Sequence, residues 1–447
     1  GHWFEKDSAA NASKKAFLTN RVGDIGFFIG IMLLYNAIGS FAFSDIFNGV
    51  SSGIIAGSTL TLAGIGLFLG AMGKSSQFPL HIWLPDAMEG PTPVSALMHA
   101  ATMVAAGVYL SVRIFPILTP DALLVVAYVG GFTALFAASI AITQSDIKKV
   151  LAYSTVSQLG YMIMAVGTGV YTIAFFHLLT HAMFKANLFY GSGSVIHAMH
   201  HALHEKDDHH TDPQNMFNMG GFKNKMTITY WSMLISTFAI AGVPLFSGFL
   251  SKDAILAGTL SFAQSNPIHF LLPVFGFGAA AITAFYMFRM MFLTFHGEPK
   301  MPDIIDDIHE SPKEMTGPII LLGTLSLFIW YTLPNFDPLS KYGWFTDLVK
   351  PVDAVVPGNL TAQQIKDGAN YAHYLAMFIS IVVAAFGIFL SWFTYIKSGL
   401  SPEAWSKRSG FLYDWSLNKY YFDENYNKYI YQPALRLADK VAWIDWE

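Results

Sequence analysis

Long apolar runs separated by short polar segments recur along the whole chain. A run of about 18 residues or more can cross a membrane as a helix. The pattern predicts about ten spans, at residues 22–43, 54–90, 94–115, 121–143, 150–167, 171–198, 227–263, 268–295, 317–333 and 371–397. Residues 401–447 are amphipathic and rich in Trp and Tyr, which favours the membrane interface. We therefore predict an all-α polytopic membrane protein.

Two of the predicted spans, 54–90 and 227–263, are interrupted, and each carries a lysine, Lys74 or Lys252. The interruptions contain Pro79, Pro85, Pro244 and Gly248. Non-helical backbone at membrane depth persists only inside protein or beside a water-filled cavity, and an ionisable group there is costly. The simpler alternative is that each lysine ends a span and extends to the headgroups. Two broken helices in matching places favour an internal repeat with an ion path at the breaks.

A run of ionisable residues marks the span between the two breaks. His177, His181 and Lys185 are four residues apart, so they lie on one face of an otherwise apolar helix. His99, on the helix after the first break, is a fourth candidate. A single histidine is more often a buried residue bonded to nearby backbone. The set together predicts a proton relay, since histidine titrates near neutrality and such sets are costly in a membrane.

Other polar residues in or near the spans have simpler interpretations. Asp24 follows Arg21 by three residues, which favours a local ion pair. Asp253 either tunes the adjacent Lys252 or caps the second half of the broken helix. A solvated turn that sets orientation is predicted to hold Asp146, Lys148 and Lys149.

The histidine-rich stretch 197–210 has helical spacing that suits zinc, because two of its histidine pairs are four residues apart. The stretch is hydrophilic and lies outside the predicted spans. We predict that it holds no metal and has no catalytic role.

Composition agrees with a membrane protein and excludes several other classes. The chain is 53% hydrophobic and only 13% charged, with a mean hydropathy of +0.43. It has no cysteine, so disulfides and thiolate chemistry are excluded. The net charge of −4 includes no basic tract for nucleic acid. Most Lys and Arg residues are predicted on the side that holds residues 1–21, which makes that side the cytoplasm or a mitochondrial matrix. The abrupt ends suggest a piece of a longer protein.

Four long motifs carry a resemblance to a known family. They occupy residues 73–110, 145–162, 176–201 and 241–256, and include GKSSQFPLHIWLPDAMEGPTP and SDIKKVLAYSTVSQLGYM. They resemble the largest antiporter-like membrane subunit (L subunit) of respiratory complex I, the proton-translocating NADH:quinone oxidoreductase. Mrp-type antiporter A subunits are relatives. Those usually carry a lysine shortly after the ATMV motif, where this chain has Ala105 and Ala106.

The resemblance implies two inverted repeats, each a half-channel around a broken helix. It places the C-terminal part of the first repeat in residues 1–115 and the second repeat in residues 121–296, with a broken helix at 244–252. Further transmembrane helices are implied in residues 317–397, followed by an interfacial segment and the start of a lateral amphipathic helix in residues 401–447. It assigns proton-relay roles to Lys74, Lys185, Lys252, His99, His177, His181 and Asp24. The family's partner glutamate for the first lysine is expected outside this chain.

The function implied is proton translocation coupled to quinone reduction elsewhere in the complex, with no redox chemistry on this chain. NAD, FMN, iron–sulfur clusters and quinone would be bound by partner subunits. The expected partners are other antiporter-like and small membrane subunits, in a bacterial cytoplasmic or mitochondrial inner membrane. One alternative is an Mrp-type cation/proton antiporter subunit, and another is a structural membrane anchor. The embedded lysines argue against an anchor.

Overall fold

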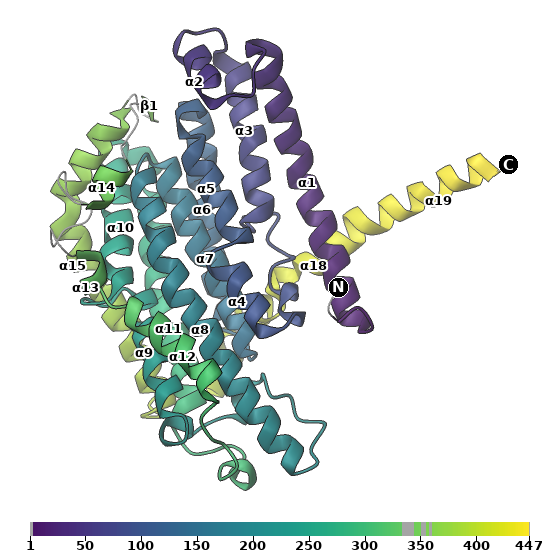
Figure 1. The fold of residues 1–447 in the computed structure, drawn as a ribbon, viewed down its shortest axis with the longest axis vertical. Helices are drawn as coiled ribbons and strands as arrows, with labels where there is room; N and C mark the ends of the chain where they lie inside the picture. The colour runs from purple at the N-terminus through teal and green to yellow at the C-terminus, as the bar shows by residue number, and fades with distance from the viewer. Residues whose placement is uncertain (1–2, 333–343, 350–354, 357–359, 447) are drawn as a thin grey trace.

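The computed structural model describes residues 3–332, 344–349, 355–356 and 360–446. Within this part, helices run roughly along the long axis of the molecule (Figure 1), and one antiparallel pair joins β1 (Val355–Val356) to β2 (Leu360–Thr361). The long helices are α1 (Asp7–Ile38), α3 (Gly57–Lys74), α6 (Pro120–Ala141), α7 (Ile147–Gly167), α8 (Tyr171–Glu205), α10 (Ser247–Ser265), α11 (Leu271–Phe295) and α15 (Ala362–Tyr395). The all-α prediction is confirmed.

Shorter helices complete the bundle and its C-terminal segment. They are α2 (Phe43–Ser51), α4 (Thr92–Ala100), α5 (Met103–Arg113), α9 (Thr227–Ala241), α12 (Lys313–Leu325), α13 (Ile329–Thr332), α14 (Trp344–Leu348), α16 (Pro402–Ser409), α17 (Phe411–Leu417), α18 (Phe422–Tyr426) and α19 (Gln432–Trp446). The span predicted at 317–333 thus divides between α12 and α13, and residue 333 lies outside the described residues.

Six helical segments of the described chain are long and apolar enough to cross a membrane. They are Asp7–Ile38, Thr92–Arg113, Pro120–Ala141, Ile147–Gly167, Pro267–Phe295 and Lys366–Tyr395. The spans predicted at 54–90 and 227–263 are instead divided by their breaks into shorter helices. Of the resulting helices, α9 has 15 residues and is too short to cross a membrane, whereas α3 and α10, with 18 and 19 residues, are outside the set of six because of their composition.

The core lies around α7, which is buried along nearly its whole circumference. Glycine permits its close contact with α6. A Cβ at Gly130 would stand 2.3 Å from the backbone nitrogen of Met164, and a Cβ at Gly160 would stand 2.6 Å from that of Ala134. Both separations are far below van der Waals contact, so larger residues would force the helices apart.

Helix starts follow ordinary capping rules. The Asp146 side chain accepts hydrogen bonds from the backbone N–H groups of Lys148 and Lys149, which caps α7. Thr119 caps α6, ahead of Pro120 in the first turn. These caps set where the buried helices enter the bundle.

The polar connections 142–146, 206–226 and 297–312 gather at one end of the bundle. The backbone N–H of Ile147 donates to the carbonyl of Gln214 at 3.0 Å, and Lys225 forms an ion pair with Asp306 at 3.1 Å. The alternation of helices therefore places these connections on one side, as the lysine pattern requires. The identity of that side as cytoplasm or matrix stays a prediction.

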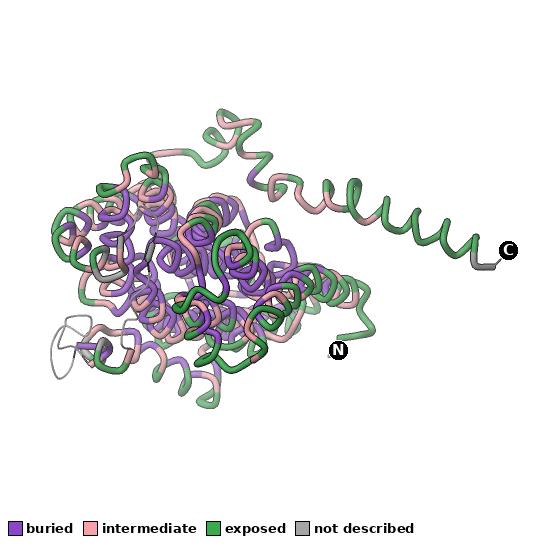
Figure 2. The backbone as a smooth tube through the Cα atoms, turned by 90° about the horizontal axis from the view of Figure 1, so that it is seen from above, coloured by how far each residue is buried: buried purple, intermediate pink, exposed green. Residues whose placement is uncertain are grey.

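The C-terminal segment leaves the bundle after α15. Short helices α16 to α18 run beside the bundle, and α19 projects away from it as a separate rod (Figures 1 and 2). In the view of Figure 2, α19 is exposed along its described length. An exposed helix with apolar residues such as Leu435, Val441 and Trp443 suits a surface that needs a partner or a membrane interface.

Candidate functional site

The first break lies between α3 and α4, and α3 ends at Lys74 as the sequence predicts. Side chains satisfy the backbone groups that the break frees. Ser75 Oγ donates to the carbonyl of Val104 at 2.6 Å, and Trp83 Nε1 donates to the carbonyl of Gly73 at 3.1 Å. The backbone N–H of Phe78 donates to Thr133 Oγ1 at 3.0 Å. Protein groups thus stabilise the irregular backbone, as membrane depth demands.

Lys74 pairs with Asp24 on α1. The Lys74 Nζ atom lies 3.5 Å from Asp24 Oδ1, and Arg21 Nη1 lies 3.3 Å from Asp24 Oδ2. The local pair predicted between Arg21 and Asp24 is therefore present, but Asp24 also bridges to the break. The Lys74 side chain is 38% exposed, so this pair is partly screened.

The second break lies between α9 and α10, at residues 242–246. Gly242 ends α9 with φ of +78°, which glycine adopts without strain. A Cβ at Gly248 would stand 2.0 Å from the carbonyl oxygen of Ala239, so only glycine permits this approach of the two half-helices. The backbone N–H of Ser247 donates to the carbonyl of Ser326, at 3.0 Å, which ties the break to α12.

Lys252 lies inside α10, after the break at 242–246, and the predicted broken helix at 244–252 covers part of the break and the start of α10. The helix resumes at Ser247 because glycine and serine at this point let it begin against α9. The Lys252 side chain is buried, and its Nζ donates to the carbonyl of Ile240 at 3.2 Å. The Nζ also lies 5.1 Å from the centre of the Tyr161 ring. Lys252 thus caps the end of α9 across the break, which suits a cation at a helix C-terminus.

Asp253 faces away from Lys252 and joins α10 to α15. Ser380 Oγ donates to Asp253 Oδ1 at 3.0 Å, and His373 Nδ1 lies 3.0 Å from Asp253 Oδ2. The expected tuning of Lys252 or capping of the half-helix is therefore wrong, because Asp253 lies in the second turn and its carboxylate meets α15.

The central helix α8 carries the three predicted residues on one buried face. His177 Nδ1 lies 2.7 Å from Ser251 Oγ, and His177 Nε2 lies 3.1 Å from Gln158 Oε1. The ring centres of His177 and His181 are 6.2 Å apart. His177 also lies close enough to Lys252 for the two to interact electrostatically. The second break and the central helix therefore meet at one polar contact.

Lys185, His181 and His99 form the interior of the site. All three are fully buried, and neither the Lys185 amine nor the imidazole nitrogens of His181 and His99 have a hydrogen-bond partner among the described residues. Lys185 is near enough to both histidines to interact electrostatically. His99 stacks on the ring of Phe189 at 4.8 Å. Buried polar atoms without partners are rare, and groups of them in a membrane mark ion paths.

The predicted residues therefore fall into two groups. One is a buried axis made of His99, Lys185, His181, His177 and Lys252, contributed by α4, α8 and α10. The other is the pair of Lys74 and Asp24 at the side of the bundle formed by α1 and α3. Chemically, the axis offers amines and imidazoles that can exchange protons in sequence. The hydroxyl of Ser251, absent from the sequence predictions, joins His177 to the helix of Lys252.

Lys148 was predicted in a solvated turn, and that prediction is wrong. It lies in the first turn of α7, is buried, and donates from Nζ to the carbonyls of Met88 at 2.6 Å and Gly90 at 3.0 Å. It also lies within electrostatic range of His99. The cap at Asp146 was the signal that could have found it, since a residue two positions after a cap lies on the helix rather than in a loop.

Replacing Lys148 with methionine should destabilise the first break. The two carbonyls would lose a charged donor, and hydrogen bonds to charged groups contribute about 1.5–3 kcal/mol each. We expect the melting temperature of the purified complex to fall by several degrees. Replacing the neighbouring Lys149, whose side chain is 41% exposed, with methionine is the matched control. This change should leave the melting temperature unchanged. An unchanged melting temperature for the Lys148 variant would contradict this role.

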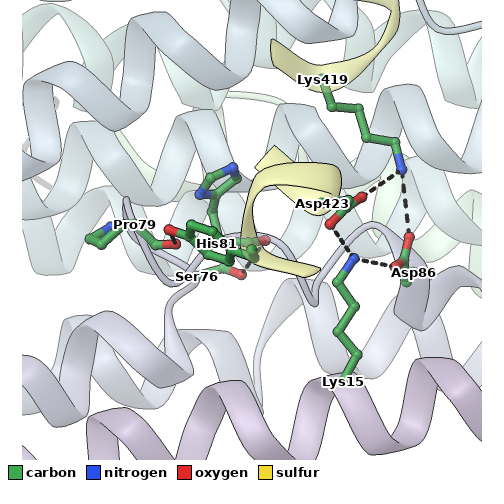
Figure 3. Close-up of polar contacts among 8 residues, drawn as sticks. Lys15, Ser76, Pro79, His81, Asp86, Lys419 and Asp423 are labelled. Carbon is green, nitrogen blue, oxygen red and sulfur yellow. Dashed lines mark hydrogen bonds and ion pairs between the residues drawn. The ribbon is translucent and has the colours of Figure 1, made fainter. Parts of the chain in front are cut away.

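A ring of four charges links the C-terminal segment to the first break (Figure 3). Lys15 Nζ lies 2.6 Å from Asp86 Oδ2 and 2.5 Å from Asp423 Oδ1. Lys419 Nζ lies 3.7 Å from Asp86 Oδ1 and 3.4 Å from Asp423 Oδ2. Each lysine thus contacts both carboxylates. Sequence reasoning missed this ring, because its members lie up to 408 residues apart in the chain.

Aromatic contacts reinforce the same junction. The Phe422 ring packs edge-on against Phe78 at 5.4 Å and against the buried His81 at 5.3 Å. Tyr426 OH donates to the carbonyl of Pro79 at 3.0 Å. The segment that leads to α19 is therefore fixed to the backbone of the break itself.

The histidine-rich stretch lies at the end of α8 and in the connection after it. His201 Nδ1 lies 3.5 Å from Glu205 Oε1, and Lys206 pairs with Asp307 at 3.1 Å, which raises the pKa of Lys206. Among the described residues, no group of three histidine or carboxylate side chains is placed to hold a metal ion. The absence of a metal role stays a prediction.

Replacing the exposed histidines of this stretch with glutamine should leave function near normal. The five positions are His200, His201, His204, His209 and His210, which lie beyond the buried axis. We expect assembly and ion translocation within error of the parent complex. Zinc analysis of the purified complex is the check, and stoichiometric zinc that disappears in the variant would contradict the prediction.

Comparison with known proteins places this arrangement in a family. The family model described as NADH:quinone oxidoreductase/Mrp antiporter, transmembrane, matches residues 1–283. The chain is 42% identical to NAD(P)H-quinone oxidoreductase chain 5 of Picosynechococcus sp., covering 100% of this chain and 68% of that protein. It is 42% identical to NADH-quinone oxidoreductase subunit L of Rickettsia bellii, covering 98% of this chain and 66% of that protein.

A solved structure shares the fold. The Mrp complex from Dietzia sp. matches with a TM-score of 0.68 and 23% identity, covering 91% of this chain and 43% of that chain. The chain spans about two thirds of the length of the quinone oxidoreductase subunits that it matches. The match of the family model, together with those relatives, shows that the chain belongs to the NADH:quinone oxidoreductase/Mrp antiporter family of membrane proteins.

Proposed function

We propose that this protein is a proton-translocating membrane-arm subunit of an NADH:quinone oxidoreductase. The observation that carries the proposal is the buried axis of Lys185, His181 and His99, whose titratable nitrogens have no partner among the described residues. Such groups are costly in a bilayer and persist where ions move. The relatives are named as subunits of quinone oxidoreductases, so quinone reduction is the reaction to which we propose that proton movement is coupled.

The path proposed for protons runs along α8 to the second break. Lys185 exchanges a proton with His181 or His99, His177 continues the path, and Ser251 connects His177 to the helix that carries Lys252. Lys74 and Asp24 form a second charge pair whose opening or closing biases the axis. A protonated lysine repels a proton on a neighbouring group, so charge at one position shifts occupancy at the next.

Redox chemistry belongs to partner subunits in this proposal. NAD, FMN, iron–sulfur clusters and quinone would be held there, and the chain would sit beside other antiporter-like and small membrane subunits. The membrane would be a bacterial cytoplasmic or mitochondrial inner membrane. Support comes from the apolar helices and from bacterial relatives such as the subunit of Rickettsia bellii.

The second candidate is an Mrp-type cation/proton antiporter subunit, favoured by the shared fold of the Dietzia complex. Affinity purification of the chain from its native membrane separates the two. Peripheral flavin and iron–sulfur subunits, with NADH-driven proton uptake in sealed vesicles, would support the first proposal. Recovery of small membrane subunits alone, with sodium-driven proton exchange, would support the second. A purified assembly that moves neither ion would instead favour a structural anchor.

A further inference from the structure

A cavity of about 430 Å³ opens between the end of α11, the end of α15 and the interfacial helices α16 and α17. It lies at the end of the bundle where the connection 142–146 also lies. Its walls are mainly apolar and aromatic, with contributions from Phe285, Leu390, Leu400 and Trp405. The volume is within the range of about 300–1,000 Å³ that small-molecule sites occupy.

Arg289 of α11 lies in the wall of this cavity. It is 3% exposed and stands between two rings, with its guanidinium carbon 5.6 Å from the Phe217 ring centre and 6.0 Å from that of Tyr395. Its Nε donates to Tyr395 OH at 3.1 Å, and its Nη1 donates to the carbonyl of Gln144 at 2.8 Å. Both acceptors are neutral.

The charge of Arg289 is therefore not compensated by the protein. Among the described residues, no carboxylate forms an ion pair with it, and a guanidinium has further N–H groups beyond the two in use. A buried cation without a counter-charge is costly. Glu403 is the carboxylate among the cavity residues, but it is exposed and accepts from Ser401 Oγ at 2.8 Å. The geometry calls for an anion from outside the chain.

The surroundings indicate which anion. Exposed cations stand on aromatic rings at the same edge, with Lys397 Nζ 5.5 Å from the Trp392 ring centre and the Arg408 guanidinium 5.7 Å from that of Trp405. Tryptophan and basic residues at helix ends are typical of the headgroup level of a membrane. Basic pockets between helices at that level bind anionic lipid headgroups.

We propose that this cavity binds an anionic phospholipid, with the phosphate on Arg289 and an acyl chain against Phe285 and Leu390. Arginine suits phosphate, because its planar fork forms paired charge-assisted hydrogen bonds. A free phosphate ion shares the headgroup chemistry, but it would leave the apolar walls uncovered. The site is independent of the proton axis and does not require that the proposed function be correct.

Binding of dioleoyl phosphatidylglycerol to the delipidated, purified complex tests the proposal. Native mass spectrometry counts the lipids retained, with dioleoyl phosphatidylcholine and inorganic phosphate as comparison probes. We expect Arg289→Gln to weaken phosphatidylglycerol binding about ten-fold or more, and Arg289→Lys to weaken it less, since lysine keeps the charge but loses the fork. Lys428→Gln is the matched control and should change binding little, because that exposed lysine also stands on an aromatic ring, that of Tyr429 at 5.1 Å, but lies outside the cavity wall.

The outcomes that overturn the proposal are definite. Equal binding of phosphatidylglycerol and phosphatidylcholine by the parent complex would show that the charge of the headgroup does not matter. Full displacement of phosphatidylglycerol by inorganic phosphate would show that the acyl chain does not contribute to binding. Unchanged binding in Arg289→Gln would show that Arg289 does not hold the lipid. If that variant fails to assemble, Ser406→Trp decides, because it fills the cavity and leaves Arg289 in place. Loss of phosphatidylglycerol binding in Ser406→Trp would support the proposed site, and retained binding would overturn it.

Discussion

Replacing Lys185 with alanine should reduce proton translocation about ten-fold or more while the complex still assembles, because positioned proton donors and acceptors contribute at least that much to transfer rates. The Lys185 amine is fully buried and has no hydrogen-bond partner among the described residues. Removing it therefore breaks no hydrogen bond within that part of the chain. It also relieves the cost of burying an unpaired charge. Transport should thus fall without any loss of hydrogen bonding in that part of the chain.

Two further variants separate the roles of charge and volume at Lys185. Lys185→Met keeps most of the side-chain volume, so it should lose transport as fully as alanine without the cost of a cavity. Lys149→Ala is the matched control and should transport normally, because that side chain lies at the start of α7 and is 41% exposed. The measurement is proton uptake per electron in sealed vesicles, with NADH oxidation recorded in parallel. Normal uptake in the methionine variant would show that Lys185 carries no proton.

Replacing Lys252 should reduce proton translocation nearly as much as replacing Lys185. The arginine variant of Lys252 is a sharper test than the alanine variant. Lys252→Ala removes the hydrogen bond from the amine to the carbonyl of Ile240 and should block transfer. Lys252→Arg keeps a cation at the end of α9 but should still impair transfer about ten-fold, because arginine holds its proton at any physiological pH.

The same vesicle assay checks both Lys252 variants. Lys225→Arg is the control for exchange of the two cations, because Lys225 lies on the surface in an exposed ion pair. We expect that control to transport and assemble normally. If Lys252→Arg also transports at the parent rate, Lys252 only stabilises the break through its positive charge, and the proton does not pass through it.

The helical fold and the part of the buried axis that lies on α8 could be predicted from the sequence, because both follow from local spacing. His177, His181 and Lys185 recur every four residues, so any helix must place them on one face. Apolar run length fixed which segments are helices. The first break could be predicted because four prolines, Pro79, Pro85, Pro91 and Pro93, follow Lys74. The second could be predicted because Pro244 and Gly248 interrupt an apolar run, and the structure places the break at 242–246.

Contacts between distant segments could not be predicted in the same way. Lys148 looked like a surface residue because its two acceptors lie in another part of the chain, at Met88 and Gly90. Asp253 seemed to belong to Lys252 because the two are adjacent, yet consecutive helical residues point in different directions. Its contacts with His373 and Ser380 depend on how α15 packs, which no local pattern specifies.

The ring formed by Lys15, Asp86, Lys419 and Asp423 joins α18 to the first break through four ion pairs. Each carboxylate is held by two cations, so moving any one member breaks two contacts at once. Because α19 projects from the bundle beyond this junction, a displacement of α19 reaches the first break through the ion pairs and through the contacts of Phe422 and Tyr426. By reciprocity, a rearrangement of the break also acts on the rod, and added salt weakens the connection in both directions.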